Sequence, residues 1–180
     1  MPAFAIVVAA DRSGGIGKSG GLPWRLKGDM AYFKRLTQEA PMPDTRNAVI
    51  MGRITWESIP DRFRPLPGRV NVVVSGNRDL VLPADAVRAD HLRDALDRLD
   101  LMAGIGRVFV IGGGQIYRQA LEHPGLDTIY LTRVQAQLDC DTHFPEIPAS
   151  FTLVSTSGPL ADGPLTYGFL VYERTPERSA

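Results

Sequence analysis

The chain has 180 residues, 44% of them hydrophobic, which suits a single domain over residues 1–180 with one substantial core. Twenty Lys and Arg residues balance twenty Asp and Glu residues, and the basic side chains are scattered, which argues against nucleic-acid binding and against attraction to an anionic membrane surface. The single cysteine, Cys140, excludes an intramolecular disulfide and fits a reducing compartment.

The N-terminal run MPAFAIVVAADR lacks the basic region that precedes the apolar stretch of a secretory signal. The longest apolar runs in the chain are strand-sized, which is too short to cross a bilayer. We therefore expect a cytoplasmic protein without a membrane span. No sequence feature demands an oligomer, so a monomer is expected.

Apolar, β-branched segments alternate with helix-like segments, which is the pattern of an α/β fold with a central sheet. The early strands are apolar almost throughout, as in a sheet covered on both faces, and the two late strands alternate like antiparallel edge strands. The predicted strands run over 3–10, 47–52, 69–75, 107–113, 127–134, 151–157 and 167–174. The predicted helices run over 29–37, 53–59, 91–102 and 114–122.

One acidic residue, Asp29, opens the first predicted helix and has two interpretations. Asp29, Phe33 and Leu36 are spaced i, i+4 and i+7, so the carboxylate shares a helix face with two apolar side chains. An acid at a helix start is also a good N-cap that suits the helix dipole, and on spacing alone we favour the cap. The alternative is a half-buried carboxylate that grips a ligand, because burial without a partner is costly.

Two glycine clusters follow predicted strands. Gly112, Gly113 and Gly114 join a strand to a helix, where close backbone approach and free N–H groups favour phosphate or dinucleotide binding over a plain turn. The cluster at 15–20 fits G-x-G-x-x-G, but Pro23 follows where a Rossmann motif would open a helix. That cluster is therefore interpreted as a glycine-rich loop, either a lid over a site or an ordinary flexible connection.

Two arginines also stand where strands and helices meet. Arg53 begins a predicted helix and is either a phosphate ligand or a solvated surface residue, and Arg69 begins a strand and either clamps a carboxylate or forms a structural ion pair. The group around Cys140, in D-C-D-T-H-F-P, matches no zinc-binding spacing, so we expect no metal.

Seven motifs occur in order along nearly the whole chain, and together they resemble the dihydrofolate reductase family. They are G-I-G-x-x-G-x-L-P-W, D-M-x-x-F-K-x-L-T, V-I-M-G-R-x-T-W-E-S-I, R-P-L-P-G-R-x-N-V-V-V-S, V-I-G-G-G-x-I-Y, Y-L-T and D-T-H-F-P. Each motif is weak alone, but the ordered set is specific. The resemblance implies a mixed, largely parallel eight-stranded sheet flanked by four helices.

The implied reaction is NADPH-dependent reduction of 7,8-dihydrofolate to tetrahydrofolate, which supplies one-carbon metabolism and thymidylate synthesis. Hydride passes from nicotinamide C4 to pterin C6, with protonation at N5 by water that the Asp29 carboxylate favours electrostatically. Antifolates are the implied inhibitors. The resemblance places Asp29, Leu22 and Trp24 at the catalytic centre.

For the substrate, the resemblance implies that Asp29 accepts hydrogen bonds from the pterin 2-amino group and N3 while the Thr132 hydroxyl holds the carboxylate. Arg69 is implied to clamp the α-carboxylate of the glutamate moiety. The implied substrate residues are Val7, Val8, Asp29, Met30, Phe33, Ile59, Arg69, Ile111, Tyr117 and Thr132.

For the cofactor, the glycine cluster is implied to approach the pyrophosphate, and Arg53 is implied to face the 2′-phosphate of NADPH. Gly76 and Gln115 depart from the polar or basic residues that many family members carry at these positions. This weakens the basis for a preference for NADPH over NADH. The implied cofactor residues are Ala9, Ile16, Gly17, Gly52, Arg53, Thr55, Ser75, Gly76, Asn77, Gly112, Gly113, Gly114, Gln115 and Ile116.

Three alternatives remain from the sequence. The NADPH-dependent reductases of riboflavin biosynthesis resemble this family in fold but lack the arrangement of Pro23, Trp24, Asp29 and Phe33. A nucleotide-binding module without turnover would keep the glycine cluster and lose the acid. A flavodoxin-like electron carrier would need an FMN loop, which the sequence does not show.

Overall fold

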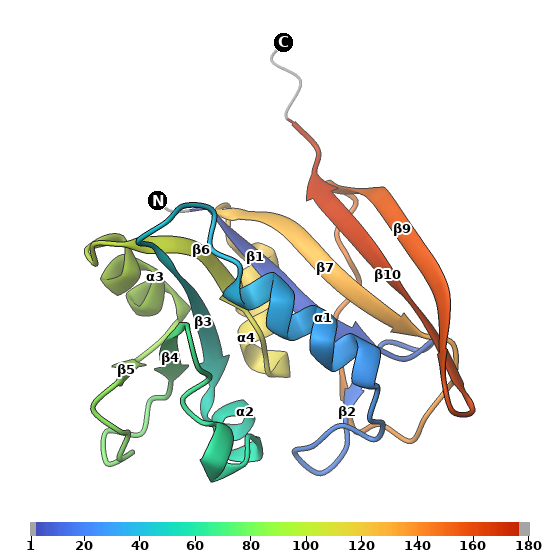
Figure 1. The fold of residues 1–180 in the computed structure, drawn as a ribbon, viewed down its shortest axis with the longest axis horizontal. Coiled ribbons are helices and arrows are strands. Elements are labelled where there is room, and N and C mark those ends of the chain that lie inside the picture. The colour runs from blue at the N-terminus through green and yellow to red at the C-terminus, as the bar shows by residue number, and fades with distance from the viewer. Residues whose placement is uncertain (1–2, 177–180) are drawn as a thin grey trace.

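The computed structural model describes residues 3–176 and arranges them around one eight-stranded sheet (Figure 1). The strand order is β5-β4-β3-β6-β1-β7-β10-β9. The six strands from β5 to β7 pair in parallel, and β10 pairs antiparallel with both β7 and β9. The strand bounds are β1 (Phe4–Ala10), β3 (Arg46–Gly52), β4 (Val70–Val74), β5 (Ala86–Ala89), β6 (Ile105–Val110), β7 (Leu126–Val134), β9 (Phe151–Asp162) and β10 (Leu165–Arg174).

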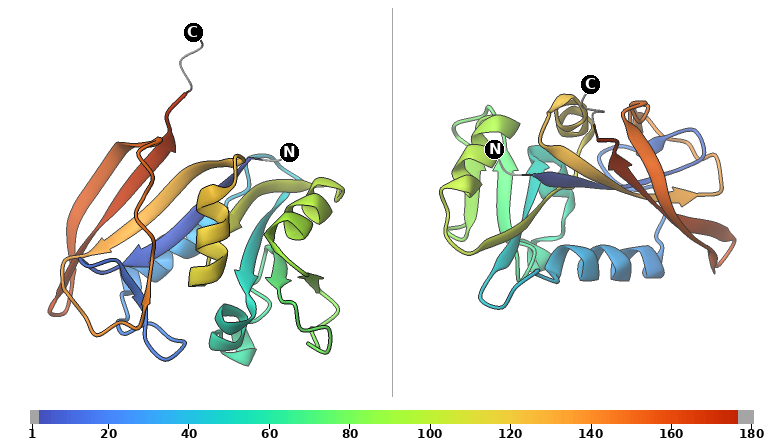
Figure 2. Two further views of the ribbon diagram at one scale, coloured as in Figure 1. Left: turned by 180° about the vertical axis from the view of Figure 1, so that it is seen from behind. Right: turned by 90° about the horizontal axis from the view of Figure 1, so that it is seen from above.

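Four α-helices flank the sheet, with α1 on one face and α3 and α4 on the other (Figure 2). A short 3-10 turn, Asp61–Phe63, follows α2. None of the helices in residues 3–176 is long and apolar enough to span a membrane. The helix bounds are α1 (Lys27–Gln38), α2 (Arg53–Ser58), α3 (Leu92–Asp100) and α4 (Gly114–Glu122).

The core lies on both faces of the sheet because side chains alternate along each strand. In β1, Ile6 and Val8 pack in the cluster that includes residues of α3 and α4, whereas Ala5 and Val7 pack in the cluster with Trp56 of α2 and Phe33 of α1. All five residues of β4 are buried. Strands buried on both faces explain the continuous apolar runs of the early sequence.

The predicted fold class is confirmed: the sheet is mixed and largely parallel, with eight strands and four helices, and the late strands form its antiparallel edge. Most observed element boundaries differ from the predicted ones by one to five residues. The strand predicted over 107–113, for example, spans Ile105–Val110, and the strand predicted over 151–157 extends to Asp162.

Three strands were missed. The first is β5, which carries Arg88 and lies at the sheet edge, where alternation is weak. The other two, β2 (Gly15–Gly17) and β8 (Thr142–His143), pair only with each other. Such short strands form because the tertiary fold brings them together.

Candidate active site

Asp29 lies in the first turn of α1 and points its carboxylate toward the sheet. The N-cap is Leu26, no side chain caps the helix start, and Thr132 Oγ1 of β7 donates to Asp29 Oδ1 at 2.6 Å. The interpretation of Asp29 as an N-cap is therefore wrong. Burial raises the pKa of Asp29 above its ordinary value, and the Thr132 hydrogen bond partly offsets this.

The start of α1 is held by residues that the sequence did not single out. The Lys27 N–H donates to Asp162 Oδ2 at 2.7 Å, and Asp162 ends β9, far along the chain. A Cβ at Gly28 would collide with the hydroxyl of Tyr167 in β10. The β9–β10 hairpin thus fixes the position of Asp29, and only a tertiary contact reveals it.

The apolar side of the pocket comes from four separate segments. Val7, Phe33, Ile59 and Ile111 all belong to one apolar cluster on the α1 face. Val8, in contrast, packs its side chain into the cluster on the α4 face, because neighbouring residues of a strand point to opposite faces. The implied role of Val8 in substrate binding stays a prediction, and it would rest on the backbone of Val8 rather than on its side chain.

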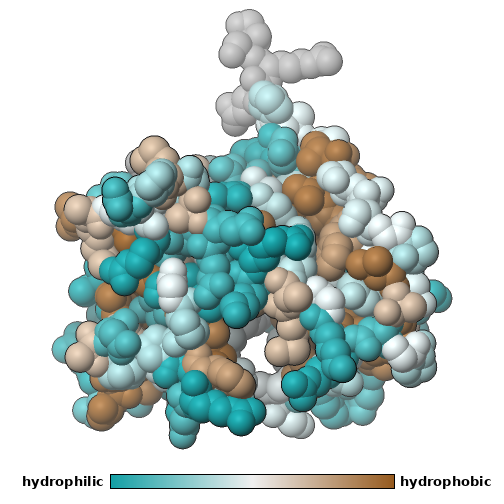
Figure 3. Space-filling view, viewed as in Figure 1, coloured by the Kyte–Doolittle hydropathy of each residue, from teal (hydrophilic) through white to brown (hydrophobic). Residues whose placement is uncertain are grey.

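Two large apolar side chains of the implied site are exposed to solvent. Met30 is 55% exposed and Leu22 is 58% exposed, although both are large and hydrophobic. Figure 3 shows the surface hollowed beneath α1, in the region that Figure 1 shows between α2 and β2. Large apolar side chains that are left exposed are suited to contacting an apolar ligand.

Tyr117 of α4 packs on the α4 face of the sheet and contacts the backbone of β1 there. Its hydroxyl donates to the Val7 carbonyl at 2.8 Å, and its side chain is buried. Burial and the neighbouring Asp29 raise the pKa of Tyr117, so the phenol stays protonated as a donor. The Val7 carbonyl keeps a second lone pair for the ligand role that the resemblance implied.

Arg69 is buried between β4 and α1. Its Nε donates to the Pro67 carbonyl at 3.0 Å and its Nη1 donates to Thr37 Oγ1 at 2.8 Å. These two bonds hold the guanidinium 6.0 Å from the centre of the Phe33 ring. Within residues 3–176, Nη2 has no hydrogen-bond partner, so a fixed fork is presented beside Phe33.

Trp24 is 7% exposed and packs with Leu26 and Tyr167, against Ala9 of β1. Its indole nitrogen is the one buried side-chain nitrogen or oxygen of the described residues that lacks a partner. Native structures rarely leave such a donor unpaired, so it marks a position where a ligand or a water accepts.

The start of α4 forms a backbone cradle with free donors. The first hydrogen bond of the helix runs from Tyr117 N–H to the Gly113 carbonyl at 3.0 Å, so the N–H groups of Gly114, Gln115 and Ile116 have no partner in the described structure. A Cβ at Gly112 or Gly113 would lie 3.4 Å from Thr55 Oγ1. The bare backbone, the helix dipole and the threonine hydroxyl fit a pyrophosphate.

The side chain of Ile116 is buried against Gly52, where a Cβ would lie 3.3 Å from Ile116 Cγ1. Ile116 can therefore contribute to this cradle through its N–H, not through its side chain. Gly52 donates its own N–H to the Gly112 carbonyl at 2.8 Å, and the peptide bond between Gly112 and Gly113 is cis.

The implied 2′-phosphate region is only partly assembled. Arg53 Nη1 contacts both carboxylate oxygens of Glu57, at 2.9 and 2.8 Å, across one turn of α2. Ser75 is buried and accepts a hydrogen bond from Asn77 N–H at 3.1 Å. A Cβ at Gly76 would meet nothing within 4 Å, so this loop offers space but no added charge.

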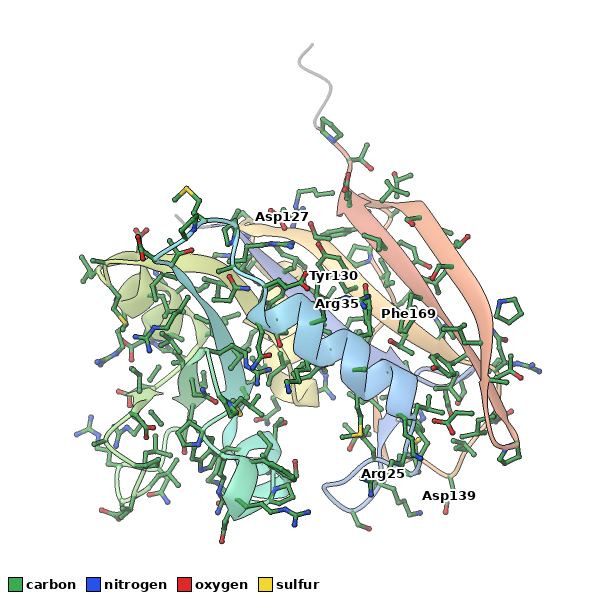
Figure 4. All side chains as sticks on the ribbon, viewed as in Figure 1. Arg25, Arg35, Asp127, Tyr130, Asp139 and Phe169 are labelled. Atoms are coloured by element: carbon green, nitrogen blue, oxygen red, sulfur yellow. The ribbon has the colours of Figure 1, made fainter. Side chains whose placement is uncertain are left out.

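Residues 15–22, which we call the lid loop, are tied to the segment around Cys140. Gly17 pairs with Thr142, and Ser19 N–H donates to Asp141 Oδ2 at 2.8 Å. Lys18 pairs with Asp139 at 2.7 Å, and Figure 4 shows Asp139 beside this loop. Ile16 packs on the core of the α4 face.

A buried acid that the sequence analysis missed anchors the lid loop. Asp11 is fully buried, and its carboxylate accepts from Gly15 N–H at 2.7 Å, from Ser13 N–H at 2.8 Å and from Leu138 N–H at 2.8 Å. These bonds lower the pKa of Asp11 against the effect of burial. The sequence D-R-S-G-G carried a signal for it, since Asp before Ser and Gly favours an Asx turn.

Comparison with known proteins identifies the family of this chain. The model described as dihydrofolate reductase matches residues 3–174. This chain belongs to the dihydrofolate reductase family. A dihydrofolate reductase from Heliothis virescens is 42% identical over 177 residues, covering 94% of this chain and 96% of that protein. The solved structure of Schistosoma mansoni dihydrofolate reductase aligns with a TM-score of 0.84 at 37% identity, over 96% of this chain and 98% of that one.

Plant relatives add a difference in length. A bifunctional dihydrofolate reductase-thymidylate synthase from Daucus carota is 46% identical over 180 residues, covering 95% of this chain but 34% of that protein. The chain thus spans about a third of the length of these bifunctional relatives. Family membership implies a nicotinamide cofactor and disfavours the riboflavin reductase alternative.

Proposed function

We propose that this chain reduces 7,8-dihydrofolate to tetrahydrofolate with NADPH. The observation that carries the proposal is the half-buried Asp29 carboxylate, held by Thr132 in an apolar pocket beside the glycine cradle of α4. A buried carboxylate without a cationic partner is unfavourable unless a ligand supplies donors. The 2-amino group and ring N3 of a pterin supply two such donors side by side.

Orientation is the main contribution of the pocket. Asp29 fixes one edge of the pterin, while Phe33, Ile59 and Ile111 hold its faces and the benzoyl ring. Arg69 binds the glutamate α-carboxylate through its preset guanidinium. Holding two reactants in an aligned geometry replaces a bimolecular encounter, which is a large part of the rate gain.

The Asp29 carboxylate also favours protonation at N5 electrostatically. We propose that a water brings the proton, because Asp29 binds the far edge of the pterin. The unpaired indole N–H of Trp24 is placed to hold an ordered water at the pocket. Leu22 in the lid loop limits the access of bulk water when the pocket is filled.

The cradle fits NADPH through the free N–H groups of Gly114, Gln115 and Ile116 and the Thr55 hydroxyl. When bound, this cofactor supplies the hydride. Arg53 gives up its ion pair with Glu57 and binds the 2′-phosphate instead, which supports a preference for NADPH. Ser75 and Asn77 flank that position. A Michaelis constant for NADH equal to that for NADPH would refute this part of the proposal.

The decisive assay mixes the protein with NADPH and dihydrofolate and follows the loss of absorbance at the nicotinamide band. Wild type is expected to turn over dihydrofolate, and Asp29→Asn is expected to lose about 10²-fold or more in kcat/KM at neutral pH. Asp127→Asn is the matched control, since Asp127 is exposed at the other end of β7 from Thr132 (Figure 4). Turnover of a pyrimidine ribitol substrate in place of dihydrofolate would favour the alternative that the chain is a reductase of riboflavin biosynthesis. Cytoplasmic location and a monomeric state remain predictions.

A further inference from the structure

An open cavity of about 510 Å³ lies at the surface, on the sheet face opposite Asp29 and beside the segment that joins β8 to β9. Figure 2 shows this segment running along the face that carries α4. Leu131 and Tyr172 form its floor, and both pack in the core cluster of that face. Leu131 and Arg133 point into this cavity and Thr132 between them points to Asp29, because side chains alternate along β7. The volume is within the range of small-molecule sites.

Two arginines give the cavity its charge. Arg12 and Arg133 line it, and neither forms an ion pair within the described part of the chain. Arg133 Nη1 donates to the Asp11 carbonyl at 2.9 Å, which leaves its other donors for a ligand. Glu146 is the one carboxylate in the lining, so the positive charges exceed the negative.

Beside these charged groups and Ser13, the lining includes apolar and aromatic side chains. Phe151 is buried, Tyr172 is half-buried, and Phe144 closes one side. A guanidinium matches a carboxylate with two parallel bonds, and aromatic side chains accept a flat ring. The two arginines together with the aromatic side chains therefore fit a small aromatic carboxylate better than a neutral ring.

The walls of the cavity come from both segments that hold the lid loop. Arg12, Ser13 and Gly14 form the turn that the Asp11 carboxylate organises, and Phe144 N–H donates to the Gly14 carbonyl at 2.8 Å. A molecule that contacts Gly14 and Phe144 together binds best when these segments are paired. By linkage, its binding shifts the lid loop toward the paired arrangement.

We propose that this cavity is an effector site for small aromatic carboxylates, and that occupation of the site stabilises the pairing of β2 with β8. The site lies across the sheet from the proposed substrate pocket. Its existence does not depend on the proposed reductase activity, because binding and pairing are measured without turnover.

The test titrates the full chain with 2-naphthoate by calorimetry in the presence of saturating dihydrofolate and no NADPH, so that the pterin pocket is occupied. We expect one binding site and at least tenfold weaker binding of the neutral 2-naphthamide. Arg12→Gln is expected to weaken naphthoate binding about tenfold, as the loss of a charge-assisted contact does. Arg118→Gln, which removes another exposed arginine, from α4, is expected to leave naphthoate binding unchanged.

Pairing of the lid loop is read from amide hydrogen exchange. The N–H groups of Asp141 and Phe144, which donate to Gly17 and Gly14 carbonyls, are expected to exchange more slowly with naphthoate bound. Equal binding of the amide, equal binding by Arg12→Gln, or competition with dihydrofolate would each overturn the site. Binding without a change in exchange would overturn its link to the lid loop.

Discussion

Asp29 occupies a half-buried position that costs stability when its carboxylate is ionised, which the proposed ligand would offset. Burial raises its pKa above the value in the unfolded chain, so between those two values the folded chain binds more protons. The stability contributed by this group is therefore present at low pH and is lost as the pH rises through that window. Above the window the ionised carboxylate depends on the Thr132 hydroxyl and on ligand donors.

The first prediction concerns the stability of Asp29→Asn. The variant is expected to unfold at a higher urea concentration than wild type at neutral pH, because the neutral amide removes the cost of a buried charge. That advantage should shrink as the pH falls below the raised pKa, where wild-type Asp29 is itself neutral. Urea unfolding across a pH series measures this, and a variant less stable than wild type at every pH would contradict it.

Arg69 illustrates a side chain positioned by the protein before any ligand arrives. Its Nε and Nη1 are held by Pro67 and Thr37, so the orientation of its planar fork is set. Lysine at this position keeps the charge but presents no fork. Among residues 3–176 Arg69 forms hydrogen bonds but no ion pair, so the structural ion pair that the sequence left as an alternative is wrong. The carboxylate clamp stays a prediction.

Arg69→Lys is accordingly expected to raise the KM for dihydrofolate about tenfold or more and to change the KM for NADPH little. Steady-state kinetics with each substrate varied in turn gives both constants. A matched loss toward both substrates would indicate a general disturbance of the fold. Thermal unfolding of the variant serves as the control for such a disturbance.

At the scale of elements, the pairing of β2 with β8 depends on close contact between two residues. A Cβ at Gly15 would lie 2.5 Å from Cys140 Sγ and 2.6 Å from Cys140 Cβ, so alanine cannot be accommodated without a shift. Gly15 N–H also donates to the buried Asp11 carboxylate. Only glycine therefore fits at position 15, where the lid loop packs against Cys140 and Asp11.

Gly15→Ala is expected to weaken this pairing, to raise the KM for NADPH several-fold and to speed exchange at the Phe144 amide. The double variant Gly15→Ala with Cys140→Gly removes the opposing sulfur and should restore both values toward wild type. Failure of the double variant to recover would show that the contact with Cys140 does not control the lid loop.

At the scale of the whole molecule, the sheet separates the two largest apolar clusters, which differ in how much they contribute to the candidate site. The face with α1 and α2 carries Asp29 and the apolar side of the candidate site, whereas the face with α3 and α4 holds the larger apolar cluster and contributes to the site only through the start of α4 and Tyr117. Leu96 of α3 is 1% exposed in the larger cluster. The same separation places the proposed effector cavity on the far side of the sheet from Asp29.

Leu96→Ala is expected to lower the free energy of unfolding by about 2–5 kcal/mol, as truncation of a buried leucine does. The kcat/KM of the folded protein, measured well below its melting temperature, should stay unchanged because Leu96 lies on α3, which contributes no residue to the candidate site. Denaturant unfolding and steady-state kinetics on the same preparation check both parts. A large fall in kcat/KM with the fold intact would show that the two faces are coupled.

The amino-acid sequence determined the alternation of strands and helices, the burial of the early strands and the glycine cradle at α4. These features depend on local composition and periodicity, which a single segment carries by itself. The order of the motifs along the chain also pointed to the family, and the fold class and the position of Asp29 in the first turn of α1 agree with it.

Only the tertiary structure decided which partner each polar group takes. Asp29 meets Thr132 from 103 residues away, Lys27 meets Asp162, and Asp11 holds Gly15 and Leu138. It also showed that Val8 faces away from the pocket and that β2 and β8 are strands. Such contacts join residues that are distant in the chain, and their distances and burial are set by the packing of the whole sheet, which no local pattern records.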